Sequence, residues 1–231
     1  MLVCRRPDRN KYLDTGCVSL KDFRFLFEKY ALGQHRRPEW QIQKFLSKFH
    51  GKIAFDIGAY HGQYAKLFSK RFDQVYAFEP DREAAEFLSS LRLSNVLIYQ
   101  MALSDRNGDE LLYRYDGLFC PGIMETFELN MNTEKGDGQY NGVNPVKVRA
   151  TTYDSFAPHL PVDLVKIDVE GAEFKVLEGM KQAFLNRQVR RIIVELHNMD
   201  REKELYFRLT NYGFNPYWID SSHCFGSLDP W

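Results

Sequence analysis

The architecture of this 231-residue chain follows from one segment, Lys52-Ile-Ala-Phe-Asp-Ile-Gly-Ala-Tyr-His-Gly62. Its first six residues form a mainly apolar run, which is typical of a strand buried inside a sheet. The run stops at Gly58, where the chain is free to turn sharply, and a helix is expected from about Gln63 to Lys70. A strand, a glycine turn and a helix in this order are typical of the first unit of an open α/β sheet.

The same alternation of strand and helix continues along the chain. Asp81 is positioned to cap the helix that follows the second strand. A late strand at 214–219 can run antiparallel to the others. The pattern indicates a Rossmann-like α/β fold, in which helices cover both faces of a mostly parallel, doubly wound sheet. Apolar runs predict the further parallel strands at 74–78, 95–103, 162–167 and 191–195.

Two segments depart from this alternation. Residues 1–50 contain clusters of aromatic and aliphatic residues at helical spacing, which predict a helical, basic N-terminal extension. In the glycine-rich segment at about 106–150, Leu111–Tyr115 and Val146–Arg149 are predicted to pair as a β-hairpin insertion, and the long loop at 115–145 is a candidate lid. The expected domains are therefore 1–50 and 51–231, the second of which carries the insertion.

The composition excludes several classes of protein. Lys plus Arg and Asp plus Glu both number 31, so the net charge is zero and a strongly basic nucleic-acid coat protein is excluded. No apolar run is long enough to predict a membrane span or a secretory signal. The four cysteines are far apart and form no C-x-x-C pair, which is typical of free thiols in a reducing compartment. Together these features predict a cytoplasmic protein.

The charge is nevertheless distributed unevenly. Residues 1–50 carry 11 Lys or Arg against 5 Asp or Glu, whereas the remainder carries 20 against 26. A basic segment of this kind can be a solvated surface that packs against the acidic remainder of the chain. It can also bind an acidic substrate or a nucleic acid, for which the candidate residues are Arg5, Arg6, Arg36 and Arg37.

Each predicted parallel strand ends next to a carboxylate. Ligands bind beyond the carboxyl ends of the strands in such a sheet, so these acids are candidate site residues. The first turn contains Asp56, Gly58 and Gly62 but lacks the G-x-G-x-x-G pattern. Glu79 lies 21 residues after Gly58, a spacing that suits hydrogen bonds to ribose hydroxyls. Asp105 follows the third strand, where it either binds an adenine amino group or belongs to an ordinary turn.

The charges of these residues select among nucleoside cofactors. A dinucleotide would bring its pyrophosphate to the first turn, where Asp56 would repel it. S-adenosylmethionine carries an ammonium and a sulfonium instead, and a carboxylate stabilises both. ATP is disfavoured because the sequence lacks G-x-x-x-x-G-K-[ST]. Asp56 and Glu79 therefore predict S-adenosylmethionine as the cofactor, with Gly58, Gly62 and Asp105 as further contacts.

The densest group of acids follows the predicted strand at 162–167, in Lys166-Ile-Asp-Val-Glu-Gly-Ala-Glu173. Three acids within six residues are more than the capping of one helix requires. Asp168 is placed to face the sulfonium or the acceptor, and Glu170 or Glu173 to bind or deprotonate a hydroxyl. His197, which follows the next strand, is a second candidate for the general base.

A divalent metal is an alternative use of the same edge. Asp168, Glu195 and His197 are its candidate ligands, because neighbouring strands bring their ends together. Their spacing in the sequence is not that of a metal-binding motif. We therefore predict no metal from the sequence, and the alternative stays open.

Five segments within residues 51–200 together point to a family: Phe55-Asp-Ile-Gly-Ala-Tyr-His-Gly62, Ala77-Phe-Glu-Pro80, Ala102-Leu-Ser-Asp105, Thr152-Tyr-Asp-Ser-Phe156 and Lys166-Ile-Asp-Val-Glu-Gly-Ala-Glu173. They resemble the FkbM family of S-adenosylmethionine-dependent methyltransferases. The resemblance implies a class I methyltransferase fold and methylation of hydroxyls on macrolides or on sugars of surface glycans. It also implies that Asp56 and Gly58 line the methionine, Glu79 the ribose and Asp168 the reaction centre. The chain departs from the family at Tyr60-His61, where Asn and an aliphatic residue are common.

The expected activity is O-methylation of a hydroxyl on a small molecule or glycan. The methyl group would pass in line from the sulfonium to the acceptor oxygen, with His197 or Glu170 as the base and Asp168 orienting the acceptor. Two other functions stay open: a nucleic-acid methyltransferase that uses residues 1–50, and a non-catalytic scaffold that binds a nucleoside. An NAD oxidoreductase is disfavoured by the charge of the first turn.

Overall fold

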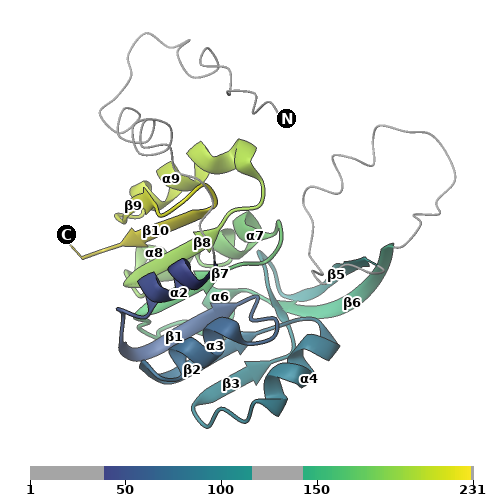
Figure 1. Ribbon diagram of the computed structural model, residues 1–231. Helices are drawn as coiled ribbons and strands as arrows, with labels where there is room; N and C mark the ends of the chain where they lie inside the picture. The colour runs from purple at the N-terminus through teal and green to yellow at the C-terminus, as the bar shows by residue number, and fades with distance from the viewer. Residues whose placement is uncertain (1–38, 116–142, 230–231) are drawn as a thin grey trace, which may run out of the picture.

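The computed structural model of the chain describes residues 39–115 and 143–229 (Figure 1). Within these two ranges, no helix is long and apolar enough to cross a membrane. Outside them lie most of the candidate lid and the basic residues Arg5, Arg6, Arg36 and Arg37.

A seven-stranded sheet forms the centre of the molecule (Figure 1). Its strands are β1 (Gly51–Ile57), β2 (Phe72–Phe78), β3 (Val96–Tyr99), β7 (Leu164–Ile167), β8 (Arg191–Glu195), β9 (Asn215–Trp218) and β10 (His223–Ser227). Their order across the sheet is β3-β2-β1-β7-β8-β10-β9. The first five pair in parallel, and β10 is antiparallel to both of its neighbours. The predicted mostly parallel α/β sheet is therefore confirmed.

Helices cover both faces of this sheet. They are α2 (Glu39–Leu46), α3 (Gln63–Phe68), α4 (Arg82–Ser90), α6 (Tyr153–Phe156), α7 (Glu173–Glu178), α8 (Lys181–Leu185), the 3₁₀ helix η3 (Met199–Arg201) and α9 (Glu202–Asn211). Successive residues of β1 point to opposite faces. Ala54 belongs to a core with α2, α3 and α4, whereas Phe55 belongs to a core with α6 to α9. The first of these cores includes Ile42 and Leu46 of α2, so the described part of the predicted N-terminal extension packs on the sheet.

A second, three-stranded sheet extends from the first (Figure 1). It consists of β4 (Ala102–Leu103), β5 (Gly108–Tyr115) and β6 (Val143–Thr151). The predicted hairpin is confirmed, since β5 and β6 pair antiparallel with Leu111 opposite Lys147. The predicted strand at 95–103 instead divides into β3 and β4, because the chain leaves the large sheet after Tyr99 to build the small one.

Two further features differ from the sequence-based expectation. Strand β10 was not predicted, because His-Cys-Phe-Gly-Ser shows neither an apolar run nor a clear alternation. The helix expected after β7 divides into α7 and α8 at Gly179, whose backbone lies so close to the carbonyl of Ser104 that a Cβ would overlap with it. The cap at Asp81 is as predicted, since its carboxylate accepts a hydrogen bond from the amide of Ala84 at 2.9 Å.

Replacement of Gly58 by alanine is expected to destabilise the fold far more than the same change at Gly213. Both residues have positive φ, +80° and +89°, where an L-residue is strained by about 1–2 kcal/mol. A Cβ at Gly58 would also overlap with the backbone oxygen of Asp168, whereas a Cβ at Gly213 meets nothing within 4 Å. Urea unfolding should therefore show a loss of roughly 3 kcal/mol or more for Gly58→Ala and about 1–2 kcal/mol for Gly213→Ala. Equal losses would contradict the close approach of the two strand ends.

Candidate active site

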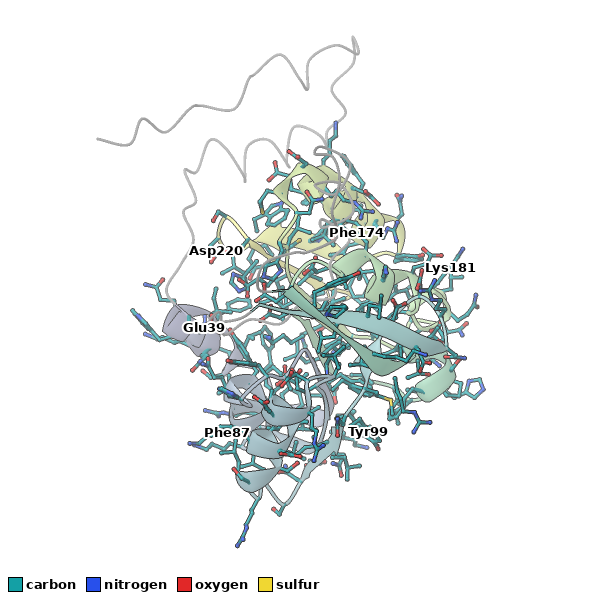
Figure 2. All side chains as sticks on the ribbon, turned by 90° about the vertical axis from the view of Figure 1, so that its right-hand side faces the viewer. Glu39, Phe87, Tyr99, Phe174, Lys181 and Asp220 are labelled. Carbon is teal, nitrogen blue, oxygen red and sulfur yellow. The ribbon has the colours of Figure 1, made fainter. Side chains whose placement is uncertain are left out.

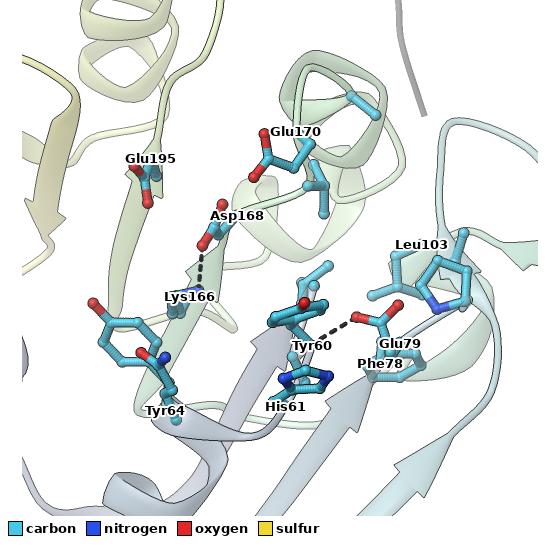
Figure 3. Close-up of a pocket in the computed structure, with 18 of the residues that line it drawn as sticks. Tyr60, His61, Tyr64, Phe78, Glu79, Leu103, Lys166, Asp168, Glu170 and Glu195 are labelled. Carbon is cyan, nitrogen blue, oxygen red and sulfur yellow. Dashed lines mark hydrogen bonds and ion pairs between the residues drawn. The ribbon is translucent and has the colours of Figure 1, made fainter. Parts of the chain in front are cut away.

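A pocket opens at the carboxyl ends of β1, β2, β7 and β8, the edge at which the sequence predicts a site (Figure 3). Its cavity volume is about 290 Å³. Side chains from distant parts of the chain meet there, because parallel strands end at the same edge of a sheet. Its charged lining residues are Glu39, Glu79, Asp168, Glu170, Glu195 and Lys166.

The glycine turn after β1 brings backbone to the wall of this pocket. Gly58 and Gly62 have φ values of +80° and +79°, in the region that favours glycine. The amides of Gly58 and Ala59 donate hydrogen bonds to the carbonyl of Phe78 at 2.9 and 3.0 Å, which ties the turn to the end of β2. Gly58 lines the pocket, and Gly62 caps the start of α3 without lining it.

Glu79 lies at the end of β2 and is fixed by backbone amides. Its two oxygens accept hydrogen bonds from the amides of Tyr60 at 2.7 Å and Asp81 at 2.8 Å. Figure 3 shows the first of these bonds at the floor of the pocket. The side chain is almost fully buried, and burial raises the pKa of Glu79 to about 7 although both amides favour its charged form. The carboxylate is thus held in one orientation, with lone pairs left for a ligand.

Lys166 lies between two carboxylates. Its Nζ is 3.0 Å from Asp168 and 3.8 Å from Asp56, and it also lies 4.3 Å from the centre of the Tyr64 ring. Asp56 is completely buried, and burial raises its pKa to about 6 against the opposing charge of Lys166. Burial also disfavours charge on Lys166 and Asp168, but their mutual attraction outweighs it, so the pKa of Lys166 is raised and that of Asp168 lowered.

His197 is surrounded by the acids of the loop after β7. Its Nδ1 lies 2.8 Å from Glu173, and its Nε2 lies 3.1 Å from Glu170 and 3.9 Å from Asp168. Burial disfavours the charged ring, but the bonds to Glu170 and Glu173 outweigh it and raise the pKa of His197 to about 11. At neutral pH the ring therefore carries a proton, which argues against His197 as the proton acceptor.

A second histidine network was not predicted from the sequence. His223 of β10 has Nδ1 at 3.0 Å from Asp220 and Nε2 at 3.2 Å from Glu195, which lines the pocket. The bonds to Asp220 and Glu195 outweigh burial and raise the pKa of His223 to about 9. Glu39 of α2 also comes close to Glu195 and His223, with one ligand atom of each within 4.8 Å of the others. Figure 2 shows Glu39 on the same side of the molecule as Asp220. Of this network, the sequence indicated only Glu195, at the end of β8. His223 was not indicated because it belongs to β10, a strand that was not predicted.

The predicted site residues fall into two groups. Gly58, Glu79, Asp168 and Glu170 line the pocket. His197 stands behind Glu170, Asp56 is buried against Lys166, and Asp105 is exposed and accepts a hydrogen bond from Ser104. The three metal ligands proposed from the sequence are divided, since Glu195 groups with Glu39 and His223, and Asp168 groups with His197 and Glu170.

Two aromatic side chains that were not among the predicted site residues also lie at the pocket. The rings of Tyr60 and His61 stack at 3.8 Å, and Phe87 of α4 lies 4.6 Å beyond His61. Tyr60 and His61 both line the pocket. Their sequence signal was the departure from the family pattern at these two positions.

Comparison with known proteins identifies the family. The sequence model described as the methyltransferase FkbM domain matches residues 56–216. The chain belongs to the FkbM methyltransferase family. No curated protein was found to match the sequence.

One solved FkbM structure shares the fold of this chain, and two other methyltransferase structures show a weaker likeness. The FkbM methyltransferase of Methylobacillus flagellatus has 14% sequence identity and a TM-score of 0.51, and the match covers 87% of this chain and 50% of that chain. This chain thus spans about half the length of that relative. An rRNA methylase of Streptococcus thermophilus has 14% identity and a TM-score of 0.47 over 84% and 98% of the two chains. A putative methyltransferase of Streptococcus mutans, solved with SAH, has 14% identity and a TM-score of 0.44 over 83% and 96%.

The family match confirms two predictions made from the sequence. The fold is that of a class I methyltransferase, and S-adenosylmethionine is the cofactor of this family. The match begins at Asp56 and includes Glu79 and the segment Lys166–Glu173. It begins after Glu39 and ends before Asp220 and His223, so these three residues lie outside the matched segment.

Removal of the Lys166 charge is expected to destabilise this FkbM protein strongly. Lys166→Met would leave Asp56 as a buried carboxylate without its cation, which costs about 3–5 kcal/mol. Adding Asp56→Asn to the same chain should restore part of this loss, because it removes the unpaired charge. Both variants are compared by urea unfolding.

The matched control is Lys181→Met. Lys181 forms an exposed ion pair with Glu178 at 3.8 Å, and such pairs contribute less than about 1 kcal/mol. If Lys166→Met and Lys181→Met lowered the unfolding free energy equally, the pairing of Lys166 with Asp56 would not stabilise the fold.

Proposed function

We propose that this FkbM protein transfers the methyl group of S-adenosylmethionine to a hydroxyl of a sugar, a glycan or another small natural product. One observation carries the proposal: a single pocket has the fixed carboxylate of Glu79 at one end and the acids Asp168 and Glu170 at the other (Figure 3). The first end suits a ribose, and the second suits a hydroxyl that must lose a proton.

On the cofactor side, Glu79 receives the ribose hydroxyls. Its oxygens already accept hydrogen bonds from Tyr60 and Asp81, but each carboxylate oxygen has a further lone pair. Gly58 brings backbone close to the cofactor, and Asp56 acts through Lys166 because it does not line the pocket. Asp105 and Gly62 lie outside the lining, and we assign them to the turns that shape it.

On the acceptor side, Glu170 takes the hydroxyl proton and Asp168 orients the acceptor. Both residues line the pocket, whereas His197 stands behind them with its ring nitrogens against Glu173 and Glu170. His197 therefore positions Glu170. The carbon–sulfur bond breaks as the carbon–oxygen bond forms, the electron pair of the former goes to sulfur, and the hydroxyl proton goes to Glu170.

The charge of the pocket favours an acceptor without phosphate groups. Five carboxylates and one lysine line it, and a phosphodiester in this position would be repelled. A neutral hydroxyl compound meets no such repulsion and offers hydrogen bonds to the same acids. This supports a sugar or other small hydroxyl compound over a nucleic acid.

Cofactor affinity is expected to rise with pH through about pH 7. Glu79 accepts ribose hydrogen bonds through both oxygens only when it is ionised, and its pKa is about 7. Below that pH the association constant for S-adenosylmethionine should fall by up to about tenfold per pH unit. Calorimetric titrations between about pH 5.5 and 7.5 measure this dependence.

Two variants test the assignment of this pH effect. Glu79→Gln should bind the cofactor weakly and with little dependence on pH. Glu86→Gln, an exposed residue of α4, should behave as the unmodified chain. A pH dependence that survives in Glu79→Gln would belong to another group.

Turnover is expected to depend on Glu170 once an acceptor is found. A screen of SAH release with sugars, glycans and macrolide polyols, and with RNA as a separate arm, identifies that acceptor. Glu170→Gln should then lower kcat by about 10²–10⁴-fold while cofactor binding stays unchanged.

Glu178→Gln, which changes an exposed acid of α7, is the matched control and should retain full kcat. Full kcat in Glu170→Gln would remove Glu170 from the proton transfer. Methylation of RNA alone would overturn the proposed acceptor class.

A further inference from the structure

We propose that Asp168, Glu170 and His197 bind a divalent cation of the Mn²⁺ type at the acceptor end of the pocket. The site itself follows from the arrangement of the side chains. Its chemical role, activation of the acceptor hydroxyl, rests on the proposed function.

The three side chains already converge. One ligand atom from each lies within 4.8 Å of the other two. His197 Nε2 is 3.1 Å from Glu170 Oε2 and 3.9 Å from Asp168 Oδ1. Ligands bound to one ion at about 2.0–2.6 Å are about 3–5 Å apart, so an ion between them would require little movement.

A buried carboxylate orients the imidazole toward this point. Glu173 is completely buried, and its Oε1 lies 2.8 Å from Nδ1 of His197. When Nδ1 donates to that oxygen, Nε2 is the nitrogen left to bind a cation. Metal-binding histidines typically have such a carboxylate on their other nitrogen.

The same glutamate supplies an independent sign of a cation. Glu173 Oε1 also accepts a hydrogen bond from the amide of Gly171 at 2.9 Å. Its Oε2 is buried and has no hydrogen-bond partner within residues 39–115 and 143–229. A completely buried carboxylate with one unpaired oxygen is stabilised by positive charge nearby, and an ion bound to Nε2 of His197 would supply such charge beyond the ring that Glu173 contacts.

The two oxygens of Asp168 face different partners. Its Oδ2 accepts a hydrogen bond from Lys166 at 3.0 Å, whereas Oδ1 faces His197. One oxygen is therefore fixed by the protein and the other is directed to the proposed ion. Lys166 itself bonds to Oδ2 of Asp168 and lies 3.8 Å from Asp56.

Two carboxylates and one imidazole suit Mn²⁺ or Zn²⁺ better than Mg²⁺ or Ca²⁺, which prefer oxygen ligands alone. Asp168 and Glu170 line the pocket, so an acceptor hydroxyl can complete the coordination from that side. Coordination lowers the pKa of the hydroxyl, and the free oxygen of Glu170 then takes its proton.

Titration of the full chain with Mn²⁺, followed by electron paramagnetic resonance, tests the site without cofactor or acceptor. We expect loss of the free-ion signal at one Mn²⁺ per chain. His197→Gln and Asp168→Asn should abolish this binding, and Glu173→Gln should weaken it by about 10–100-fold. Glu170→Gln removes a proposed ligand as well and should also lower Mn²⁺ affinity. Because Glu170 is a half-exposed loop residue, this variant is expected to keep its fold.

Glu39→Gln is the matched control, because Glu39 belongs to the other group of candidate ligands, with Glu195 and His223. It should bind Mn²⁺ as the unmodified chain does. Loss of binding in Glu39→Gln with retention in His197→Gln would move the ion to that group and overturn the proposal. Absence of Mn²⁺ binding in the unmodified chain would overturn it as well.

The role of the ion is tested separately. If the chain binds Mn²⁺ at this site but methylates no hydroxyl compound, the proposed function fails and the site stands. If chelator-treated protein methylates its acceptor as fast as the Mn²⁺-loaded protein, the function stands and the role of the ion in it is overturned.

Discussion

Lys166 carries its charge into the middle of the parallel sheet, and the polar end of the fold is organised around it. Its Cα is paired in register with that of Asp56 on the neighbouring strand, and its side chain reaches forward to Asp168. The ring of Tyr64 contributes a further face of negative potential at 4.3 Å. Without this cation, two carboxylates would share a region of low dielectric, and one of them would take up a proton. The lysine therefore permits a charged Asp168 at the wall of the pocket.

Glu79 shows the other way in which this fold keeps a carboxylate in a buried position. Its partners are two neutral amides rather than a cation, so burial prevails and its pKa rises to about 7. Asp168 is partly buried, but the charges of Lys166 and His197 outweigh the effect of burial and its pKa falls. The two ends of the pocket thus differ in kind. Glu79, at the proposed nucleoside end, has a pKa near neutral pH, whereas Asp168, at the proposed acceptor end, has a lowered pKa that favours its charged form.

The sequence predicted the elements that follow from local pattern, and it failed where the contact is between distant strands. The strands β1, β2, β7 and β8, the Asp81 cap and the β5–β6 hairpin are all encoded in runs of a few residues. No such run encodes the buried position of Asp56, because that position depends on the strand register that brings Lys166 beside it. A usable signal was present: both residues lie one position before the last residue of their predicted strands. Two oppositely charged residues in equivalent places on adjacent buried strands indicate a buried pair.

The two histidine networks beside the pocket have a common electrostatic effect. His197 lies among Glu170, Glu173 and Asp168, and His223 lies between Asp220 and Glu195; both rings have pKa values raised well above neutrality. The raised pKa values favour positive charge on both rings, which, together with Lys166, offsets part of the negative charge of the neighbouring acids. In methyl transfer the sulfonium loses its charge on the way to the transition state. A purely acidic wall would therefore stabilise the bound cofactor more than the transition state, and the reaction would be slowed. In the proposed function, Lys166 and the two histidines offset part of this acidic charge, so the acids can hold a hydroxyl while they stabilise the charged sulfonium less strongly.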